Sequence, residues 1–132
     1  MSDAALRILF IDDEQAVLDG IARVLRTRHP DWVTSFVSDP LEALKVYARM
    51  QGDLQVVVCD INMPKVSGLQ IMRAVKERTP GVAVIALTGQ LDILSLKGIQ
   101  KYADAHLCKP VDVEALCTAI LAVHQRRTRP MS

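Results

Sequence analysis

Four consecutive apolar residues, Val56 to Cys59, run directly into the carboxylate of Asp60. A run of β-branched residues without polar alternation is typical of a strand buried on both faces, as central strands of parallel sheets are. Asp60 is therefore expected at the carboxyl end of such a strand. Because ligands bind at this edge of open α/β sheets, Asp60 is a candidate metal ligand, nucleophile or helix cap.

Strand and helix patterns alternate five times along the chain of 132 residues. Strands are expected at 6–11, 32–37, 56–60, 82–87 and 105–108. Helices are expected at 15–28, at 40–51, from 69 to the turn at Pro80-Gly81, at 91–102 and at 113–123. This alternation predicts an α/β fold whose parallel sheet is covered on both faces. Periodicity leaves the strand order open; in the flavodoxin-like order 2-1-3-4-5 the switch point lies between the first and third strands.

Three helices are expected to begin at recognisable caps. Asp39 precedes Pro40, and Ser67 forms a capping box with Gln70. Asp112 is expected to cap the last helix.

Two further expectations concern buried side chains. The apolar pattern of the second helix is expected to be carried by Leu41, Leu44, Ala48 and their neighbours. The three cysteines show no CxxC spacing or other zinc-binding pattern, so we expect buried, reduced thiols at Cys59, Cys108 and Cys117.

The length fits one domain, which we expect at residues 1–125, followed by a basic tail or the start of a linker at 126–132. Sixteen basic and fifteen acidic residues give a formal net charge of +1, which does not favour nucleic acid or an anionic membrane as a partner. No apolar run approaches the roughly 18 residues of a membrane span. Residues 1–5 lack the features of a signal peptide, so a cytoplasmic location is expected.

Carboxylates follow the first strand as well as the third. In the flavodoxin-like order, Asp12 and Asp13 would meet Asp60 at one sheet edge, where they repel one another unless a cation is present. An all-oxygen set of ligands suits Mg²⁺. Thr88 and Lys109, after the fourth and fifth strands, would bind a phosphoryl group that Asp60 accepts as an acyl phosphate. Taken singly, each acid could instead be a helix cap, and Lys109 a surface residue.

These residues make the chain resemble the receiver domain of two-component response regulators, from about residue 6 to residue 123. The motifs that carry the resemblance are Ile11-Asp12-Asp13-Glu14, Cys59-Asp60-Ile61-Asn62-Met63-Pro64 with Gly68, Leu87-Thr88-Gly89, and Lys109-Pro110. The resemblance implies a doubly wound, flavodoxin-like (βα)5 fold with five parallel strands in the order 2-1-3-4-5.

The resemblance also implies a role for each site residue. Asp60 would be the phospho-acceptor, Thr88 the switch hydroxyl, and Lys109 the contact to the phosphoryl group. The Mg²⁺ ligands would be Asp12, Asp13, Asp60 and the backbone carbonyl of Asn62. The bond between Lys109 and Pro110 would be cis. The family usually has Tyr or Phe three residues before the lysine, so His106 would take the place of this aromatic switch.

Such a domain is a phosphorylation-dependent signalling switch that catalyses only its own phosphotransfer and autodephosphorylation. The implied partner is a sensor histidine kinase or a phosphotransfer protein, and the signal would pass to an output domain or partner protein. Direct nucleic acid binding and membrane contact are not expected. A homodimer through residues 91–123 is a further expectation, because the helices there carry surplus apolar residues: Ile93, Leu96, Ala115, Ala119 and Ala122.

Two alternatives belong to other functional classes. A Mg²⁺-dependent phosphatase with an aspartyl nucleophile would need a second Asp two residues after Asp60 as general acid, and Asn62 cannot donate a proton in that way. A flavodoxin-like module that binds a nucleotide would need a glycine-rich first loop. Acids occupy this loop instead and would repel phosphates.

Overall fold

A computed structural model describes residues 5–89 and 93–128, except for the side chains of residues 93, 94, 127 and 128. The strands are β1 (Arg7–Ile11), β2 (Val33–Val37), β3 (Val56–Asp60), β4 (Ala83–Thr88) and β5 (Ala105–Cys108). The helices are α1 (Gln15–Arg28), α2 (Pro40–Met50), α3 (Gly68–Arg78), α4 (Ile93–Tyr102) and α5 (Val113–Thr128). The alternation that the sequence predicts is confirmed.

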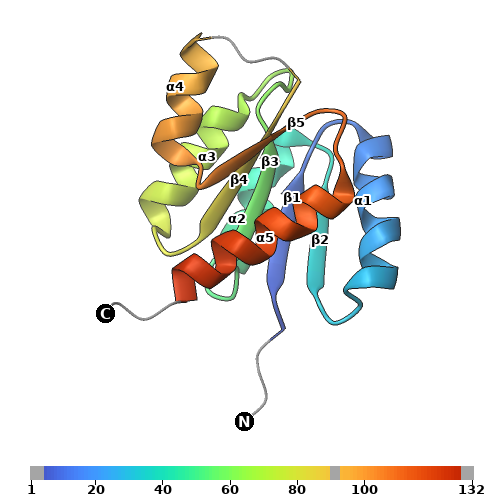
Figure 1. Ribbon diagram of the computed structural model, residues 1–132. Helices are drawn as coiled ribbons and strands as arrows, with labels where there is room; N and C mark the ends of the chain where they lie inside the picture. The colour runs from blue at the N-terminus through green and yellow to red at the C-terminus, as the bar shows by residue number, and fades with distance from the viewer. Residues whose placement is uncertain (1–4, 90–92, 129–132) are drawn as a thin grey trace.

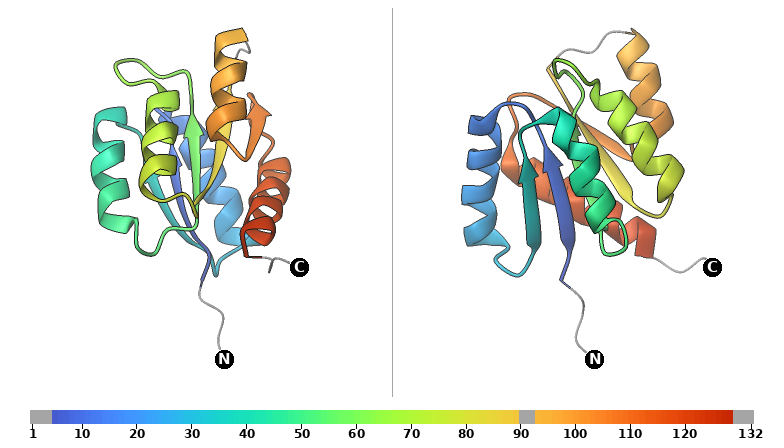
Figure 2. Two further views of the ribbon diagram at one scale, coloured as in Figure 1. Left: turned by 90° about the vertical axis from the view of Figure 1, so that its left-hand side faces the viewer. Right: turned by 180° about the vertical axis from the view of Figure 1, so that it is seen from behind.

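All neighbouring strands pair in parallel, and their order is β2-β1-β3-β4-β5. Helices α1 and α5 cover one face of this sheet, and α2, α3 and α4 cover the other (Figures 1 and 2). The expected flavodoxin-like α/β class is confirmed. The strand order reverses between β1 and β3, so the residues that follow these two strands flank the switch point.

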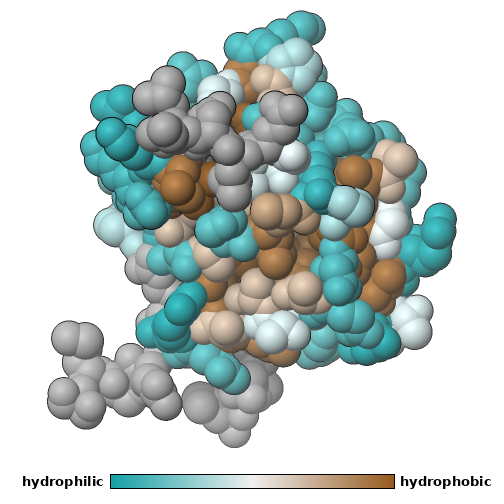
Figure 3. Space-filling view, turned by 45° about the horizontal axis from the view of Figure 1, so that its top comes forward, coloured by the Kyte–Doolittle hydropathy of each residue, from teal (hydrophilic) through white to brown (hydrophobic). Residues whose placement is uncertain are grey.

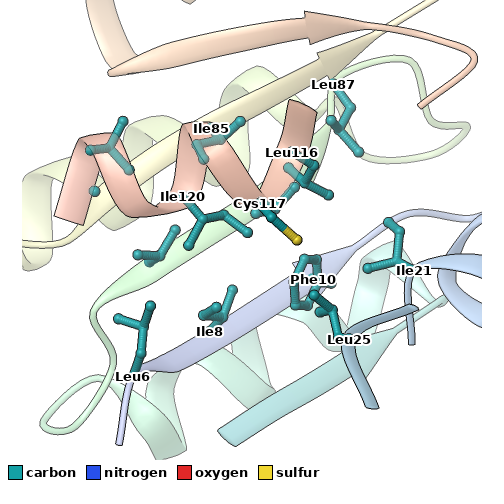
Figure 4. Close-up of a cluster of buried hydrophobic side chains, with 14 of the residues drawn as sticks. Leu6, Ile8, Phe10, Ile21, Leu25, Ile85, Leu87, Leu116, Cys117 and Ile120 are labelled. Atoms are coloured by element: carbon teal, nitrogen blue, oxygen red, sulfur yellow. The ribbon is translucent and has the colours of Figure 1, made fainter. Parts of the chain in front are cut away.

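The two faces of the sheet hold separate apolar clusters because side chains alternate along each strand. On the first face, α5 places Leu116 and Ile120 over Phe10 and Ile85 of the sheet (Figure 4). The other face packs the intervening strand residues against α2 and α3. Every residue of β3 is buried. Packing on both sides thus fixes where β1 and β3 end.

The three expected helix caps are confirmed. Asp39 Oδ1 accepts a hydrogen bond from Leu41 N at 2.9 Å. At α3, Ser67 and Gln70 form the reciprocal capping box. Asp112 Oδ1 accepts a hydrogen bond from Glu114 N at 3.0 Å at the start of α5.

The fully buried residues of α2 are neighbours of the named positions, and of the three named residues only Leu44 packs against the core. Leu41 is 53% exposed and Ala48 is exposed, whereas Ala43 and Tyr47 are fully buried. Both sets have helical spacing, so periodicity alone does not distinguish them. The Tyr47 hydroxyl lies 2.6 Å from Thr79 Oγ1, and this hydrogen bond allows a polar aromatic side chain to take the core position.

One of the three expected buried thiols is wrong. Cys59 and Cys117 are buried, but Cys108 is exposed. Cys108 belongs to β5, an edge strand on which every second side chain is exposed.

Helix α5 continues through Thr128 and so extends past residue 125, where the end of the domain is expected from the sequence. Residues 129–132 lie outside the described part of the chain.

We predict that Gly68→Ala lowers the free energy of unfolding by about 2 kcal/mol or more. Gly68 begins α3 against the end of β3, where an added Cβ would clash with the Asp60 carbonyl oxygen and lie 2.5 Å from Ile61 Cα. Urea unfolding measures the change. Gly20→Ala is the control, since open space surrounds Gly20 on α1, and it should raise stability by about 0.5–1 kcal/mol. A Gly68→Ala protein as stable as wild type would contradict this close approach.

Candidate functional site

Three carboxylates converge at the carboxyl edge of the central strands. Asp12 and Asp13 follow β1, and Asp60 ends β3. One carboxylate oxygen from each lies within 4.8 Å of the other two. Asp12 is 0% exposed and Asp60 is 1% exposed, while Asp13 is half-buried. The structure therefore brings together the acids on which the sequence argument depends.

Backbone hydrogen bonds fix the orientation of two of these acids. Asp12 Oδ1 accepts from Glu14 N, and Asp60 Oδ1 accepts from Asn62 N, both at 2.9 Å. In each case the bond closes a short turn just after the strand. The second oxygen of each carboxylate thus remains directed to the space between the strands' ends, where Lys109 contacts it.

The Lys109 ammonium group joins the cluster from the end of β5. Its Nζ lies 3.0 Å from Asp60 Oδ2 and 2.9 Å from Asp12 Oδ2. A third carboxylate oxygen, Glu14 Oε1, lies 2.8 Å from the same Nζ. Lys109 N donates to the Thr88 carbonyl at 2.8 Å, and the following bond to Pro110 is cis. The backbone therefore directs the lysine toward the acids.

The oxygen atoms of the cluster fit a metal ion. Asp12 Oδ2 is at ion-pair distance from Lys109, yet this buried atom accepts no well-aligned hydrogen bond from the described residues. A buried carboxylate oxygen that has an ion pair but no well-aligned hydrogen bond, in a set of carboxylate oxygens, suits a hard divalent cation such as Mg²⁺. Asp12, Asp13 and Asp60 could each supply one ligand.

Burial dominates the protonation behaviour of the site. It raises the pKa of the Asp60 carboxyl from 3.8 to about 6, and the charge of Asp12 adds to this, although bonds from Asn62 N and Lys109 act the other way. Burial by itself lowers the pKa of Lys109, but contacts with Glu14, Asp12 and Asp60 outweigh it and leave this pKa above its usual value. Lys109 thus stays positively charged. Its single charge does not balance the negative charges of the three carboxylates that it contacts, Asp12, Glu14 and Asp60.

A second polar contact links the loop after β3 to the end of β4. Thr88 is fully buried, and its hydroxyl lies 3.5 Å from Asn62 Oδ1. The same amide oxygen accepts a hydrogen bond from Gly89 N at 3.2 Å. From the sequence, only the backbone carbonyl of Asn62 is expected to take part in the site, and this role of its side chain is an addition from the structure. The sequence signal for this role is the position of Asn62, two residues after Asp60 in a loop that follows a central strand.

His106 lies on β5 beside Ala86 of β4, and Thr88 lies two residues after Ala86. Side chains two residues apart share a sheet face, so His106 and Thr88 lie on the same side of the sheet. The His106 side chain is exposed in this structure. The aromatic-switch role that the resemblance gives His106 would therefore require its side chain to leave this exposed position.

Comparisons with known proteins indicate one family. The family model described as response regulator receiver domain matches residues 8–121. Response regulator MprA of Mycobacterium leprae is 31% identical over 126 residues, which cover 95% of this chain and 53% of that protein. Transcriptional regulatory protein DegU of Brevibacillus brevis is 30% identical over 126 residues, which cover 95% of this chain and 52% of that protein. The chain thus spans about half the length of these relatives.

A solved structure gives the same result for the fold. The crystal structure of a response regulator receiver domain protein from Clostridium thermocellum matches with a TM-score of 0.85 and 33% identity. The match covers 96% of this chain and 99% of that one.

We predict that Asp60→Asn stabilises the metal-free protein. Because folding raises the Asp60 pKa from 3.8 to about 6, the folded state binds the proton more tightly. The contribution of Asp60 to stability therefore falls as pH rises from about 4 to about 6, and the loss persists at higher pH. In the presence of a chelator at about pH 7, Asp60→Asn should raise the unfolding free energy by about 1–3 kcal/mol.

The difference between the two proteins should narrow as pH falls below about 6 and should close below the unfolded-state pKa of 3.8, where Asp60 becomes protonated in both states. Asp31→Asn, at an exposed loop residue, is the matched control and should change stability little. An Asp60→Asn protein that is less stable than wild type at neutral pH would contradict the claim that this carboxylate is buried at a cost.

Proposed function

This chain belongs to the response regulator receiver domain family, and we propose that Asp60 is the residue through which it receives its signal, as an aspartyl phosphate. The general function of the family is a phosphorylation switch in two-component systems. The observation that carries the assignment to Asp60 is its buried carboxylate at the switch point, bonded to Lys109 and grouped with Asp12 and Asp13.

In the proposed reaction, a carboxylate oxygen of Asp60 attacks the phosphorus atom of the donor. A new P–O bond forms as the bond to the leaving group breaks, and the leaving group takes a proton from solvent. Lys109, already 3.0 Å from Asp60 Oδ2, binds an oxygen of the transferred group. The Thr88 hydroxyl, at the end of β4, would donate a hydrogen bond to another oxygen of this group.

Mg²⁺ is the proposed cofactor, held by Asp12, Asp13, Asp60 and the backbone carbonyl of Asn62. It would neutralise charge on the carboxylates and on the phosphoryl oxygens during transfer. The chain's own residues orient the reacting carboxylate: Asn62 N holds one Asp60 oxygen and Lys109 the other.

The domain is a signalling module and not a conventional enzyme. A phosphatase of the aspartyl type would need a proton donor two residues after the nucleophile, and Asn62 instead uses its amide oxygen to accept from Gly89 N. The loop after β1 carries Asp12 and Asp13, which would repel a bound nucleotide. We propose that its catalysis extends only to its own phosphorylation and autodephosphorylation.

The proposed phosphodonor is a sensor histidine kinase or a phosphotransfer protein, and the proposed setting is the cytoplasm. None of the described helices has the length and apolar character to cross a membrane. We take residues 1–125 as the receiver unit. MprA and DegU are roughly twice as long as this chain, so an output domain or a partner protein is the proposed recipient of the signal.

The proposed partner surface lies on α4, β5 and α5. Leu96 is 36% exposed and Leu121 is 39% exposed, and Ala122 is also exposed. Apolar residues gather on the face that carries α5 (Figure 3). Ala115 and Ala119 are partly buried, and the side chain of Ile93 lies outside the described residues. We propose that phosphorylation changes this surface through Thr88 and His106.

Acetyl phosphate with Mg²⁺ should add one phosphoryl group to the wild-type protein, and Asp60→Asn should abolish stable labelling because the acceptor oxygen is lost. Intact-protein mass spectrometry measures the product. Asp53→Asn is the control and should be labelled normally, because Asp53 is exposed and precedes the start of β3, whereas Asp60 lies at the other end of this strand. Unchanged labelling of Asp60→Asn, or a wild-type protein that is not labelled, would contradict the proposed function.

Beryllofluoride, which mimics a bound phosphoryl group, should increase self-association of the chain or its affinity for an output partner. Sedimentation velocity with and without the mimic tests the first outcome, and Leu121→Glu should weaken the response. Leu41→Glu is the matched control, because this leucine is also exposed but lies on α2. Identical sedimentation with and without beryllofluoride, together with unchanged affinity for a partner, would contradict the proposal that this surface binds partners.

A further inference from the structure

Lys109 makes one ion pair that the phosphotransfer step does not use. Its Nζ lies 2.8 Å from Glu14 Oε1, in addition to its contacts with Asp12 and Asp60. The Asp12 and Asp60 side chains are almost fully buried, whereas the Glu14 side chain is 60% exposed. A single ammonium group therefore has two buried partners and one partner at the surface of the site.

The backbone of Glu14 is fixed, and its side chain is left available for this contact. Glu14 N donates to Asp12 Oδ1, and the Glu14 carbonyl accepts from Val17 N at 3.0 Å. Glu14 is the N-cap residue of α1, where Ser, Thr, Asp or Asn would stabilise the helix through a side-chain hydrogen bond. The Glu14 side chain makes no such cap bond and reaches Lys109 instead.

A cation at the acids and the Lys109 ammonium group compete for the same atoms. Lys109 contacts Asp12 Oδ2 and Asp60 Oδ2, which belong to two of the three carboxylates that fit a divalent ion. Two positive charges at these oxygens repel each other, so the ammonium group must withdraw or find compensating charge as a metal ion binds. Glu14 supplies that charge on the exposed side of Lys109.

We propose that Glu14 is a positioning residue that acts through Lys109: it holds the ammonium group on the outer side of the site while a metal ion binds Asp12 and Asp60. The inference rests on the proposed function and adds to it a residue that sets the affinity of the site for Mg²⁺. Without the Glu14 carboxylate, Lys109 settles on the two buried carboxylates and competes more strongly with the metal.

Mg²⁺ titrations of the unphosphorylated protein, followed by calorimetry or by NMR of backbone amides, test this role. Glu14→Gln should raise the Kd for Mg²⁺ by about threefold to tenfold. On a Lys109→Gln background the same substitution should change the Kd by less than about twofold, because an exposed charge is screened at about 0.15 M ionic strength. Glu77→Gln, which removes an exposed carboxylate on α3, is the matched control and should leave the Kd unchanged.

Glu14→Ser separates positioning from helix stability. Serine is a good N-cap residue, so this variant should raise the melting temperature while still weakening Mg²⁺ binding. A wild-type Kd in Glu14→Gln, or a loss of affinity that is equally large without Lys109, would overturn the role of Glu14 even if wild type is labelled at Asp60. A wild-type protein that neither binds Mg²⁺ nor is labelled would overturn the proposed function and this inference together.

Discussion

Asp12, Asp13 and Asp60 place like charges within 4.8 Å of one another at a sheet edge, and two of these side chains are almost fully buried. Water does not screen the buried pair, so their repulsion must be met by a cation or by protonation. Lys109 contacts both buried carboxylates, but burial, with a smaller effect from the Asp12 charge, raises the pKa of Asp60 more than the contacts with Asn62 N and Lys109 lower it. The site is therefore prepared for additional positive charge.

The fold maintains this arrangement through packing that lies away from the charges. β1 and β3 are covered on both faces, and α3 begins so close to the end of β3 that only glycine fits at residue 68. The strand ends cannot move apart to relieve the repulsion. Such a rigid, partly uncompensated group of carboxylates suits a metal ion, whose positive charge it complements.

Much of this was predictable from the sequence, because the decisive signals are local. Uninterrupted apolar runs mark the central strands, side-chain caps mark three helices, and the acids stand where strands end. Features that depend on tertiary packing were not predictable in the same way. The burial of Tyr47 needs its hydrogen bond to Thr79, and the exposure of Cys108 follows from the edge position of β5.

The contact between Glu14 and Lys109 joins residues 95 positions apart and depends on side-chain conformation, so no periodicity predicts it. The sequence nevertheless held one signal for it. A glutamate stands directly before α1, at a position where it is a poor helix cap. A residue that does little for the local structure is a candidate for a role in the site.

Asp60, whose two carboxylate oxygens contact Asn62 N and Lys109, is the proposed acceptor of the phosphoryl group. Reduction of the acetyl phosphate-treated protein with borohydride converts an aspartyl phosphate to homoserine, and tandem mass spectrometry of the peptides locates the converted residue. The account predicts homoserine at residue 60 alone, and only when Mg²⁺ was present. Conversion at Asp12 or Asp13, or conversion that does not depend on Mg²⁺, would contradict it.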